Sequence, residues 1–333
     1  MFINSRLYGK IGIRKNIIQG SDNLENKKYV LETYGLTKKY KEKVAVDRVN
    51  MHIEEGDIYG FVGENGAGKT TIIRLITGLI NPTSGRFALF GVNSASKEIV
   101  RVRKDMSGIV EAVSVNRGMK AIDNLKLQCL INNVSRTDEE LIALLGKVGL
   151  NYQEIQNKKA GDFSLGMTQR LGLAIAMLSN PKFIILDEPM NGLDPQGFIE
   201  VREAIVNLNK EGVTFLISSH ILAELDKVCN KIGIISHGKL LEEISIEELH
   251  NKSRKRIAVG SKDLSSLKEL LVKEFDLKEA EENNNRLLIY DEVDINDLMK
   301  VFVNNNIKID DISVIEDTIE DYYINLIVGG KHA

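Results

Sequence analysis

One glycine-rich segment brings together a lysine and two hydroxyl side chains at a spacing that suits phosphate chemistry. It reads Gly63-Glu64-Asn65-Gly66-Ala67-Gly68-Lys69-Thr70-Thr71 and matches the pattern G-x-x-x-x-G-K-[ST]. The glycines let such a loop wrap so that backbone N–H groups point at phosphate oxygens, and the helix that follows adds its partial positive charge. Lys69 would reach the β- and γ-phosphates of ATP, and the Thr70 hydroxyl would be a ligand of Mg²⁺. The sequence therefore predicts that the residues of this loop bind ATP and Mg²⁺.

Two carboxylates follow an apolar segment further along the chain, which reads Phe183-Ile184-Ile185-Leu186-Asp187-Glu188. Asp187 stands at the end of the predicted strand, where it can hold Mg²⁺ through water. Glu188 is then placed to polarise the attacking water. An acidic pair after a strand is common by itself, but together with the phosphate loop it predicts ATP hydrolysis.

A parallel sheet of class α/β is needed to position these groups. Short apolar runs at 57–62, 182–186 and 214–218 are typical of central parallel strands that are buried on both faces. Apolar residues recur at helical spacing from Thr71 to Leu79, before Asn81-Pro82, and again from Phe198 to Leu208. The alternation of strand and helix predicts the core of a P-loop NTPase with right-handed crossovers.

Other regions flank or interrupt this core. Residues 1–28 are predicted to be a flexible N-terminal tail, and residues 29–252 an ATPase domain that starts with antiparallel edge strands. Residues 97–180 read as mostly helical and are expected to form a helical subdomain inserted between two strands. Residues 253–333 follow the order β-α-β-β-α-β, the ferredoxin-like plan of a small α+β domain.

The composition limits the class of protein. A chain of 333 residues with a net charge of −3 is not basic enough to indicate a general nucleic-acid binder, so no nucleic-acid partner is expected. The apolar runs are far shorter than the roughly 20 residues that span a bilayer. Cys129 and Cys229 lie far apart without metal-ligand spacing and are interpreted as reduced thiols. The protein is therefore expected in the cytoplasm.

From about residue 31 to residue 243 the chain resembles the ABC ATPase family. The segment Phe163-Ser164-Leu165-Gly166-Met167 lies where that family carries its signature L-S-G-G-Q, and only Ser164 and Gly166 match outright. The resemblance implies that these two residues bind the γ-phosphate of the ATP held by another subunit. It also implies that Asp194, in Asn191-Gly192-Leu193-Asp194, lies at the dimer interface and that His220 is the catalytic switch histidine.

Tyr40 matches the aromatic residue on which members of the family stack adenine, although an edge-strand tyrosine without that role is the alternative. Val46 is expected to cover the other face of the base. In Ser107-Gly108-Ile109-Val110-Glu111 the family's usual glutamine is replaced by Glu111, which can still bind Mg²⁺ or its water. A misaligned surface residue is the alternative for Glu111.

This glutamate, the signature and the ending Ile319-Glu320-Asp321-Tyr322-Tyr323-Ile324-Asn325-Leu326 resemble the bacitracin-resistance and lantibiotic-immunity exporters. The resemblance implies an ATP-hydrolysing subunit that works as a homodimer or pseudo-dimer on separate transmembrane permease subunits, peripheral to the inner face of the membrane. Antimicrobial peptides are the expected cargo. The alternatives are an ABC ATPase of translation or DNA maintenance and a nucleotide-sensing module without turnover. The first usually carries two nucleotide domains or a long coiled coil, and the intact Glu188 and His220 argue against the second.

Overall fold

The computed structural model describes residues 28–252, 255–283, 285–316 and 319–329. Almost all of the tail predicted at residues 1–28 therefore lies outside the described residues. Within the described ranges, no helix combines the length and the apolar character that crossing a membrane requires.

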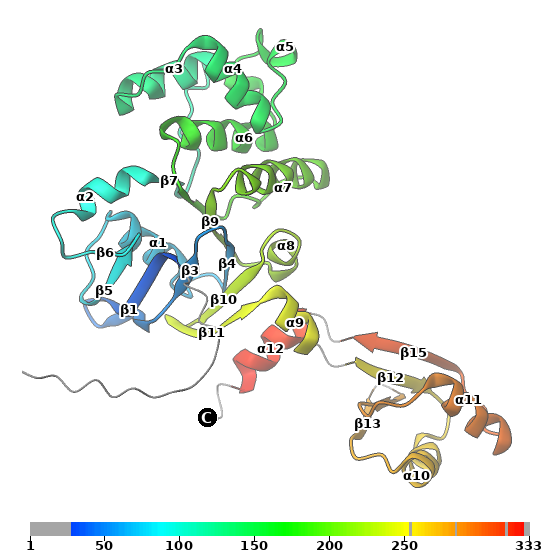
Figure 1. Cartoon of the computed structure of the whole chain (residues 1–333). Helices are drawn as coiled ribbons and strands as arrows, with labels where there is room; N and C mark the ends of the chain where they lie inside the picture. The colour runs from blue at the N-terminus through cyan, green and yellow to red at the C-terminus, as the bar shows by residue number, and fades with distance from the viewer. Residues whose placement is uncertain (1–27, 253–254, 284, 317–318, 330–333) are drawn as a thin grey trace, which may run out of the picture.

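A six-stranded sheet forms the centre of the molecule (Figure 1), in the order β11-β10-β4-β9-β8-β7. Neighbouring strands run parallel except for the antiparallel pair of β10 and β11 at one edge. The strands are β4 (Ile58–Val62), β7 (Met106–Ile109), β8 (Phe183–Asp187), β9 (Thr214–Ser219), β10 (Lys231–Ser236) and β11 (Lys239–Ser245). The predicted parallel sheet is confirmed.

Both faces of this sheet are covered, which explains why its central strands β4 and β8 are almost wholly apolar. In β8 every residue is buried, and successive side chains point to opposite faces. Phe183 and Ile185 pack into a core shared with α1 (Lys69–Thr77), whereas Ile184 and Leu186 pack into a second core on the side of the other helices. A strand buried on both sides has no place for the polar residues of an alternating pattern.

An antiparallel sheet covers the first of these cores, with strand order β2-β1-β5-β6 and β3 paired to β1. Its strands are β1 (Tyr29–Tyr40), β2 (Lys43–Val49), β3 (His52–Glu54), β5 (Ser84–Leu89) and β6 (Val92–Asn93). The helix α1 packs in the same core. It ends before the predicted Asn81-Pro82 stop, because Gly78 takes a left-handed φ of 81° and its N–H caps the carbonyl of Leu75.

The helices of the second core come mainly from the predicted helical subdomain. They are α3 (Ala121–Asn132), α4 (Asp138–Lys147), α5 (Tyr152–Ile155) and α6 (Leu165–Ala176), joined by α7 (Pro195–Lys210) and α8 (Leu222–Asp226). A capping box of Thr137 and Glu140 fixes the start of α4. The short α2 (Ile99–Val102) and β7 also lie in the range 97–180, but β7 pairs with β8 and so is part of the central sheet.

The C-terminal region contains a four-stranded antiparallel sheet in the order β13-β14-β12-β15. Its elements are β12 (Lys255–Gly260), α10 (Leu264–Phe275), β13 (Ala280–Asn283), β14 (Arg286–Ile289), α11 (Ile295–Asn304) and β15 (Asp311–Glu316). The order of elements and the strand order together confirm the predicted ferredoxin-like plan. This sheet and its two helices have a separate apolar core, which includes Val259, Leu271, Leu287 and Phe302.

Two helices connect this region with the rest of the chain. The helix α9 (Ile246–Lys252) leads from β11 towards β12, and the last helix, α12 (Ile319–Gly329), returns from β15 to the first part of the chain (Figure 1). Tyr322, Tyr323 and Leu326 of α12 pack against the second core of the central sheet. The sequence pattern placed these residues in the range of the C-terminal domain and did not indicate this contact.

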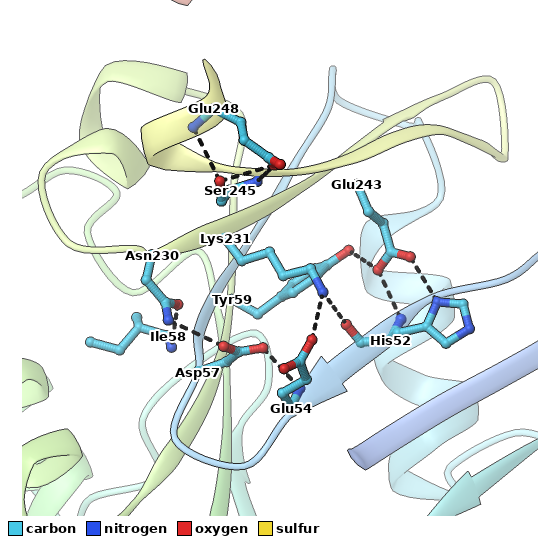
Figure 2. Close-up of polar contacts among 10 residues, drawn as sticks. All are labelled: His52, Glu54, Asp57, Ile58, Tyr59, Asn230, Lys231, Glu243, Ser245 and Glu248. Atoms are coloured by element: carbon cyan, nitrogen blue, oxygen red, sulfur yellow. Dashed lines mark hydrogen bonds and ion pairs between the residues drawn. The ribbon is translucent and has the colours of Figure 1, made fainter. Parts of the chain in front are cut away.

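A partly buried polar cluster, which we call the Glu243 network, joins β3 and β4 to β11 (Figure 2). The Tyr59 hydroxyl and the His52 backbone N–H both donate to Oε1 of Glu243 at 2.8 Å, and His52 Nδ1 lies 2.9 Å from its Oε2. Lys231 donates to the His52 carbonyl at 3.3 Å and pairs with Glu54 at 3.5 Å. Tyr59 is fully buried. This burial is the main cause, and the nearby Glu243 carboxylate the second, of a Tyr59 pKa well above its usual value.

Candidate nucleotide-binding site

The glycine-rich loop connects β4 to α1, as the motif requires. Gly68 stands before the first residue of α1 with a φ of 114°, and a Cβ at this position would lie 2.6 Å from the Ala45 carbonyl oxygen. Only glycine fits both this left-handed backbone and this close approach. The loop is thereby held against β2, and the free N–H groups at the start of α1 face the space in front of it.

Lys69 lies inside this loop and is almost completely buried. Its Nζ donates to the Gly63 carbonyl at 2.6 Å and to the Glu64 carbonyl at 3.4 Å, and it lies 3.2 Å from Oε1 of Glu188. The lysine therefore links the loop to the end of β8.

Thr70 of α1 and Asp187 at the end of β8 are in direct contact. The Thr70 hydroxyl donates to Oδ2 of Asp187 at 3.1 Å, and Ser218 on β9 donates to its Oδ1 at 2.6 Å. Ser218 was not singled out from the sequence, although it lies in a predicted central strand where a polar residue is unusual. Both oxygens of Asp187 are thus oriented by hydroxyl groups of neighbouring elements.

Glu188 follows directly after β8 in a left-handed conformation, with a φ of 51° that is uncommon for a residue with a side chain. Its backbone N–H donates to the Ser218 hydroxyl at 3.0 Å, which supports this conformation. Its Oε2 lies 2.8 Å from Nδ1 of His220, and its Oε1 faces Lys69. The structure therefore brings together Lys69, Glu188 and His220 in one polar chain.

These groups line a cavity of about 520 Å³. Its walls are Tyr40, Lys43, Ala45, Asn65, Gly66, Gly68, Lys69, Thr70, Thr71, Glu188, Asn191 and His220. Most of the predicted loop residues are in this set, whereas Gly63, Glu64 and Ala67 are not. Gly63 and Ala67 are buried, and Glu64 is exposed to solvent. No spacing rule selects Lys43 and Ala45, and Asn191 stands in the motif in which the family resemblance points to Asp194.

Of the two residues predicted to contact adenine, Tyr40 lines the cavity and Val46 does not. Tyr40 lines the cavity and is 44% exposed, with Lys38 Nζ 5.1 Å from the centre of its ring. The prediction for Val46 is wrong, because its side chain is completely buried in the core below the antiparallel sheet. Side chains alternate along a strand, so it is the preceding residue of β2, Ala45, that faces the cavity.

The Glu111 carboxylate has no hydrogen bond or ion pair with Thr70 or Asp187, the other predicted metal ligands. Glu111 is not among the residues that line the cavity, and its carboxylate forms an ion pair with Arg74 of α1. The Glu111 carboxylate raises the pKa of Arg74, mainly through the hydrogen bond and to a lesser extent through its negative charge. The prediction that Glu111 binds Mg²⁺ beside Thr70 and Asp187 therefore gains no support from this geometry.

Ser164, Gly166 and Asp194 also lie outside the cavity. Ser164 and Asp194 cap the starts of α6 and α7 by accepting hydrogen bonds from Met167 N at 3.1 Å and Gly197 N at 2.8 Å. A Cβ on Gly166 would lie 3.0 Å from the Cα of Gly197, so this glycine lets the two helices approach closely. Each residue thus has a role within the chain, and Ser164 and Asp194 remain exposed.

Comparisons with known proteins agree with the fold. A family model described as "ABC transporter" matches residues 46–191. The bacitracin transport ATP-binding protein BcrA of Bacillus licheniformis is 40% identical over 306 residues, covering 90% of this chain and 98% of that protein. The lantibiotic transport ATP-binding protein SrtF of Streptococcus pyogenes is 39% identical, covering 67% of this chain and 96% of that protein.

Among solved structures, cbiO1 of Clostridium perfringens, part of the ABC transporter complex cbiONQ, matches with a TM-score of 0.61 at 23% identity. The match covers 68% of this chain and 92% of cbiO1, and it shows that the fold is that of an ABC ATPase. Some relatives are 36% to 40% identical to this chain over most of their length. Together with this match they confirm the family indicated by the sequence motifs. The chain belongs to the ABC transporter family, among its ATP-binding ATPase subunits.

Proposed function

We propose that this chain hydrolyses MgATP in the cavity described above and that the energy drives export of an antimicrobial peptide by separate membrane-spanning subunits. The observation that carries the enzymatic part is the polar chain of Lys69, Glu188 and His220 beside Thr70 and Asp187. A nucleotide-binding loop needs the lysine, but only hydrolysis needs a carboxylate oriented towards a water molecule.

The residues present suit Mg²⁺. Within the described part of the chain, no cluster of three or more acidic, histidine or cysteine side chains could hold a metal ion by itself. Mg²⁺ is usually bound by one or two protein oxygens together with substrate phosphates, and the Thr70 hydroxyl and the Asp187 carboxylate supply such oxygens 3.1 Å apart. When bound there, the ion would neutralise charge on the β- and γ-phosphates.

In the proposed mechanism the phosphates replace the present partners of Lys69. The loop N–H groups and Lys69 bind the β- and γ-phosphates, and the adenine stacks on Tyr40. Glu188 then accepts a hydrogen bond from the attacking water and polarises it. His220, 2.8 Å from Glu188, orients that carboxylate and reaches the γ-phosphate. The unusual backbone of Glu188 supports this role, because strained residues gather at functional sites.

We further propose that the site is completed by a second ATPase subunit. Ser164, Gly166 and Asp194 lie outside the cavity of their own chain, at the starts of α6 and α7. Ser164 and Asp194 are exposed there, so they are available to an opposing copy. In a head-to-tail dimer, Ser164 and the start of α6 would face the γ-phosphate bound by the partner.

The cargo and the partners are inferred from the relatives. Bacitracin transport and lantibiotic transport are named for proteins that match this chain over most of their length. We propose a peptide of this kind as the cargo and a separate permease as the partner, which would hold the chain at the cytoplasmic face of the membrane. We also propose residues 29–252 as the ATPase domain and residues 253–333 as a C-terminal extension whose last helix packs on it.

The test compares the wild-type chain with Glu188→Gln, which removes the negative charge and keeps the size of the side chain. We expect turnover of MgATP to fall at least about 100-fold while ATP affinity is retained, because the loop and Lys69 are unchanged. In a susceptible bacterium that carries the permease, peptide resistance should be lost with the same substitution. Turnover near the wild-type rate would show that Glu188 is not the catalytic carboxylate. Loss of turnover in Glu188→Gln without any change in peptide resistance would refute the proposed cargo.

A further inference from the structure

The turn that carries His220 connects β9 to α8 (Figure 1). The imidazole of His220 is 32% exposed, so packing against its neighbours does not fix the ring by itself. Ile221 stands at the N-cap of α8 and, being apolar, offers no side-chain oxygen to the first N–H groups of that helix. The position of the imidazole beside Glu188 therefore depends on what holds the backbone of this turn.

Ser219, the last residue of β9, holds the turn through three hydrogen bonds. Ser219 is buried, and its hydroxyl accepts from the Ile221 N–H at 3.0 Å. Its carbonyl accepts from the N–H of Gly63, the first residue of the phosphate loop, at 3.4 Å. The hydroxyl also donates to Oε2 of Glu224 on α8 at 3.1 Å. Ser219 therefore joins the phosphate loop to the turn that carries the switch histidine.

The bond to Glu224 decides how the Ser219 hydroxyl is oriented. A serine hydroxyl has a single proton, and its oxygen accepts only on the sides that this proton leaves free. With the proton directed at the Glu224 carboxylate, a lone pair is available to the Ile221 N–H. A hydrogen bond to an ionised carboxylate is about twice as strong as one between neutral groups. The carboxylate therefore fixes the acceptor on which the turn depends.

The helix α8, which supplies Glu224, is itself anchored in the fold. Leu222 and Leu225 are buried in the second core of the central sheet. Oδ1 of Asp226 lies 2.9 Å from Nε2 of His250 on α9. These contacts hold α8 independently of the turn, so the helix is a fixed support from which Glu224 reaches back to Ser219.

The last helix of the chain, α12, adds a further contact to this support. It contacts α8, and its Tyr322 hydroxyl donates to Oε2 of Glu242 on β11 at 2.6 Å. The elements around α8 therefore include the edge strand of the central sheet and the helix that follows the C-terminal sheet.

We propose that Glu224 is a positioning residue for His220. By accepting the hydroxyl proton of Ser219, it fixes the turn and keeps the imidazole 2.8 Å from the carboxylate of Glu188. Glu224 is not among the residues that line the cavity, so it acts through the turn and not on the phosphates. This inference rests on the proposed function, because it concerns the orientation of His220 during MgATP hydrolysis.

The test uses the full-length chain and three substitutions on α8. Glu224→Ala removes the acceptor of the Ser219 proton, whereas Glu224→Gln keeps the size of the side chain and offers an amide oxygen to it. Asp226→Ala is the matched control, because it removes a carboxylate of the same helix that pairs with His250 instead. We measure kcat and KM for MgATP and the melting temperature of each variant.

The expected effect is on kcat. Glu224→Ala should lower kcat about tenfold to 100-fold, the range that a hydrogen bond to a charged group supports. KM should stay near the wild-type value, because the phosphate loop and Lys69 are unchanged. Glu224→Gln should restore most of the lost kcat. Asp226→Ala should keep the wild-type kcat, although its melting temperature falls.

A double variant tests the path through Ser219. Ser219→Ala should lower kcat as well, because it removes the hydroxyl that Glu224 orients. The double variant Ser219→Ala/Glu224→Ala should be no slower than Ser219→Ala alone, since residues that act through one shared bond do not have additive effects. Full addition of the two losses would show that Glu224 acts by another path.

Three further outcomes would overturn the inference. The kcat of Glu224→Ala could stay at the wild-type value, it could fall equally in Asp226→Ala, or Glu224→Gln could be as slow as Glu224→Ala. Failure of the proposed function is a separate result, because the wild-type chain would then show no turnover of MgATP. The NMR signals of the His220 ring, one of five histidines, then replace kcat. They should shift in Glu224→Ala and not in Asp226→Ala, and unshifted signals in Glu224→Ala would refute the positioning role.

Discussion

The Glu243 network makes a prediction about the stability of the central sheet. Tyr59 is fully buried in β4 and donates to the Glu243 carboxylate at 2.8 Å. Tyr59→Phe removes this donor and leaves the ring in place. A hydrogen bond to a charged group contributes about 1.5–3 kcal/mol. Because His52 still offers two nitrogens to the same carboxylate, we expect the lower half of this range, a loss of about 2 kcal/mol in the free energy of unfolding at pH 8.

The raised pKa of Tyr59 gives this effect a characteristic dependence on pH. In the unfolded chain a tyrosine loses its proton near pH 10, whereas the folded state keeps the Tyr59 proton well above that pH. The contribution of the phenol to stability is therefore complete below pH 10 and is lost as the pH rises further. The slope is about 1.4 kcal/mol per pH unit. At pH 11 the difference between wild type and Tyr59→Phe should have shrunk to about 0.6 kcal/mol.

The assay is urea unfolding at pH 8 and at pH 11, followed by circular dichroism because the chain contains no tryptophan. Tyr34→Phe is the control at pH 8, since Tyr34 is 38% exposed and a surface substitution should change stability by less than about 0.5 kcal/mol. The Glu32 side chain raises the pKa of Tyr34 as well, so this variant is not used as a control for the pH dependence. Other groups that titrate at high pH are common to both proteins and cancel in the difference. A difference between wild type and Tyr59→Phe that is equal at the two pH values would refute the reasoning, and so would a difference near zero at pH 8.

Further predictions concern the dimer, the glutamate after β7 and a buried thiol. In a Glu188→Gln background, Ser164→Arg should abolish an ATP-dependent dimer peak in size-exclusion chromatography. Ser164→Thr, which keeps the hydroxyl and the helix cap, should retain this peak. A dimer that survives Ser164→Arg would rule out a role of Ser164 at the nucleotide site of the other subunit. Because Glu111 pairs with Arg74 and does not line the cavity, Glu111→Gln and Glu111→Ala should both keep MgATP turnover within about tenfold of wild type; a larger loss of turnover in Glu111→Ala alone would show that the carboxylate acts at the metal site after all. Burial raises the pKa of the Cys229 thiol far above its usual value. Alkylation of Cys229 by iodoacetamide at pH 8.5 should therefore be slow until denaturant is added. Rapid labelling of Cys229 in the native chain would contradict this.

The sequence was sufficient to predict the features that depend on local chemistry. The phosphate loop needs its glycines for a backbone that no other residue adopts, and β8 needs an unbroken apolar run because it is buried on both faces. The ferredoxin-like order of the C-terminal region followed from turn residues and periodicity, and it is present in the structure. Such signals depend on residues that are close together in the chain.

The features that the sequence could not predict depend on distant partners or on exact register. Val46 and Ala45 are neighbours in β2, and the register shifts between β1 and β2 decide which of them faces the cavity. The ion pair of Glu111 with Arg74 joins residues that are far apart in the sequence. The apolar stripe of α12 predicts an amphipathic helix, but a stripe does not say which surface it covers.

The strand β11 places two successive glutamates on opposite sides of the sheet edge. Glu243 turns towards His52 and Tyr59, and Glu242 turns towards Tyr322. An insertion or deletion of one residue in this strand would exchange the two sides, because side chains alternate. Both carboxylates would then lose their donors at once. The pairing of β10 and β11 already contains one register shift, between Ile234 and Ile235. In natural variants of this hairpin we therefore expect strand length to change in steps of two residues, or a single added residue to be taken up in a bulge, so that each glutamate keeps its side.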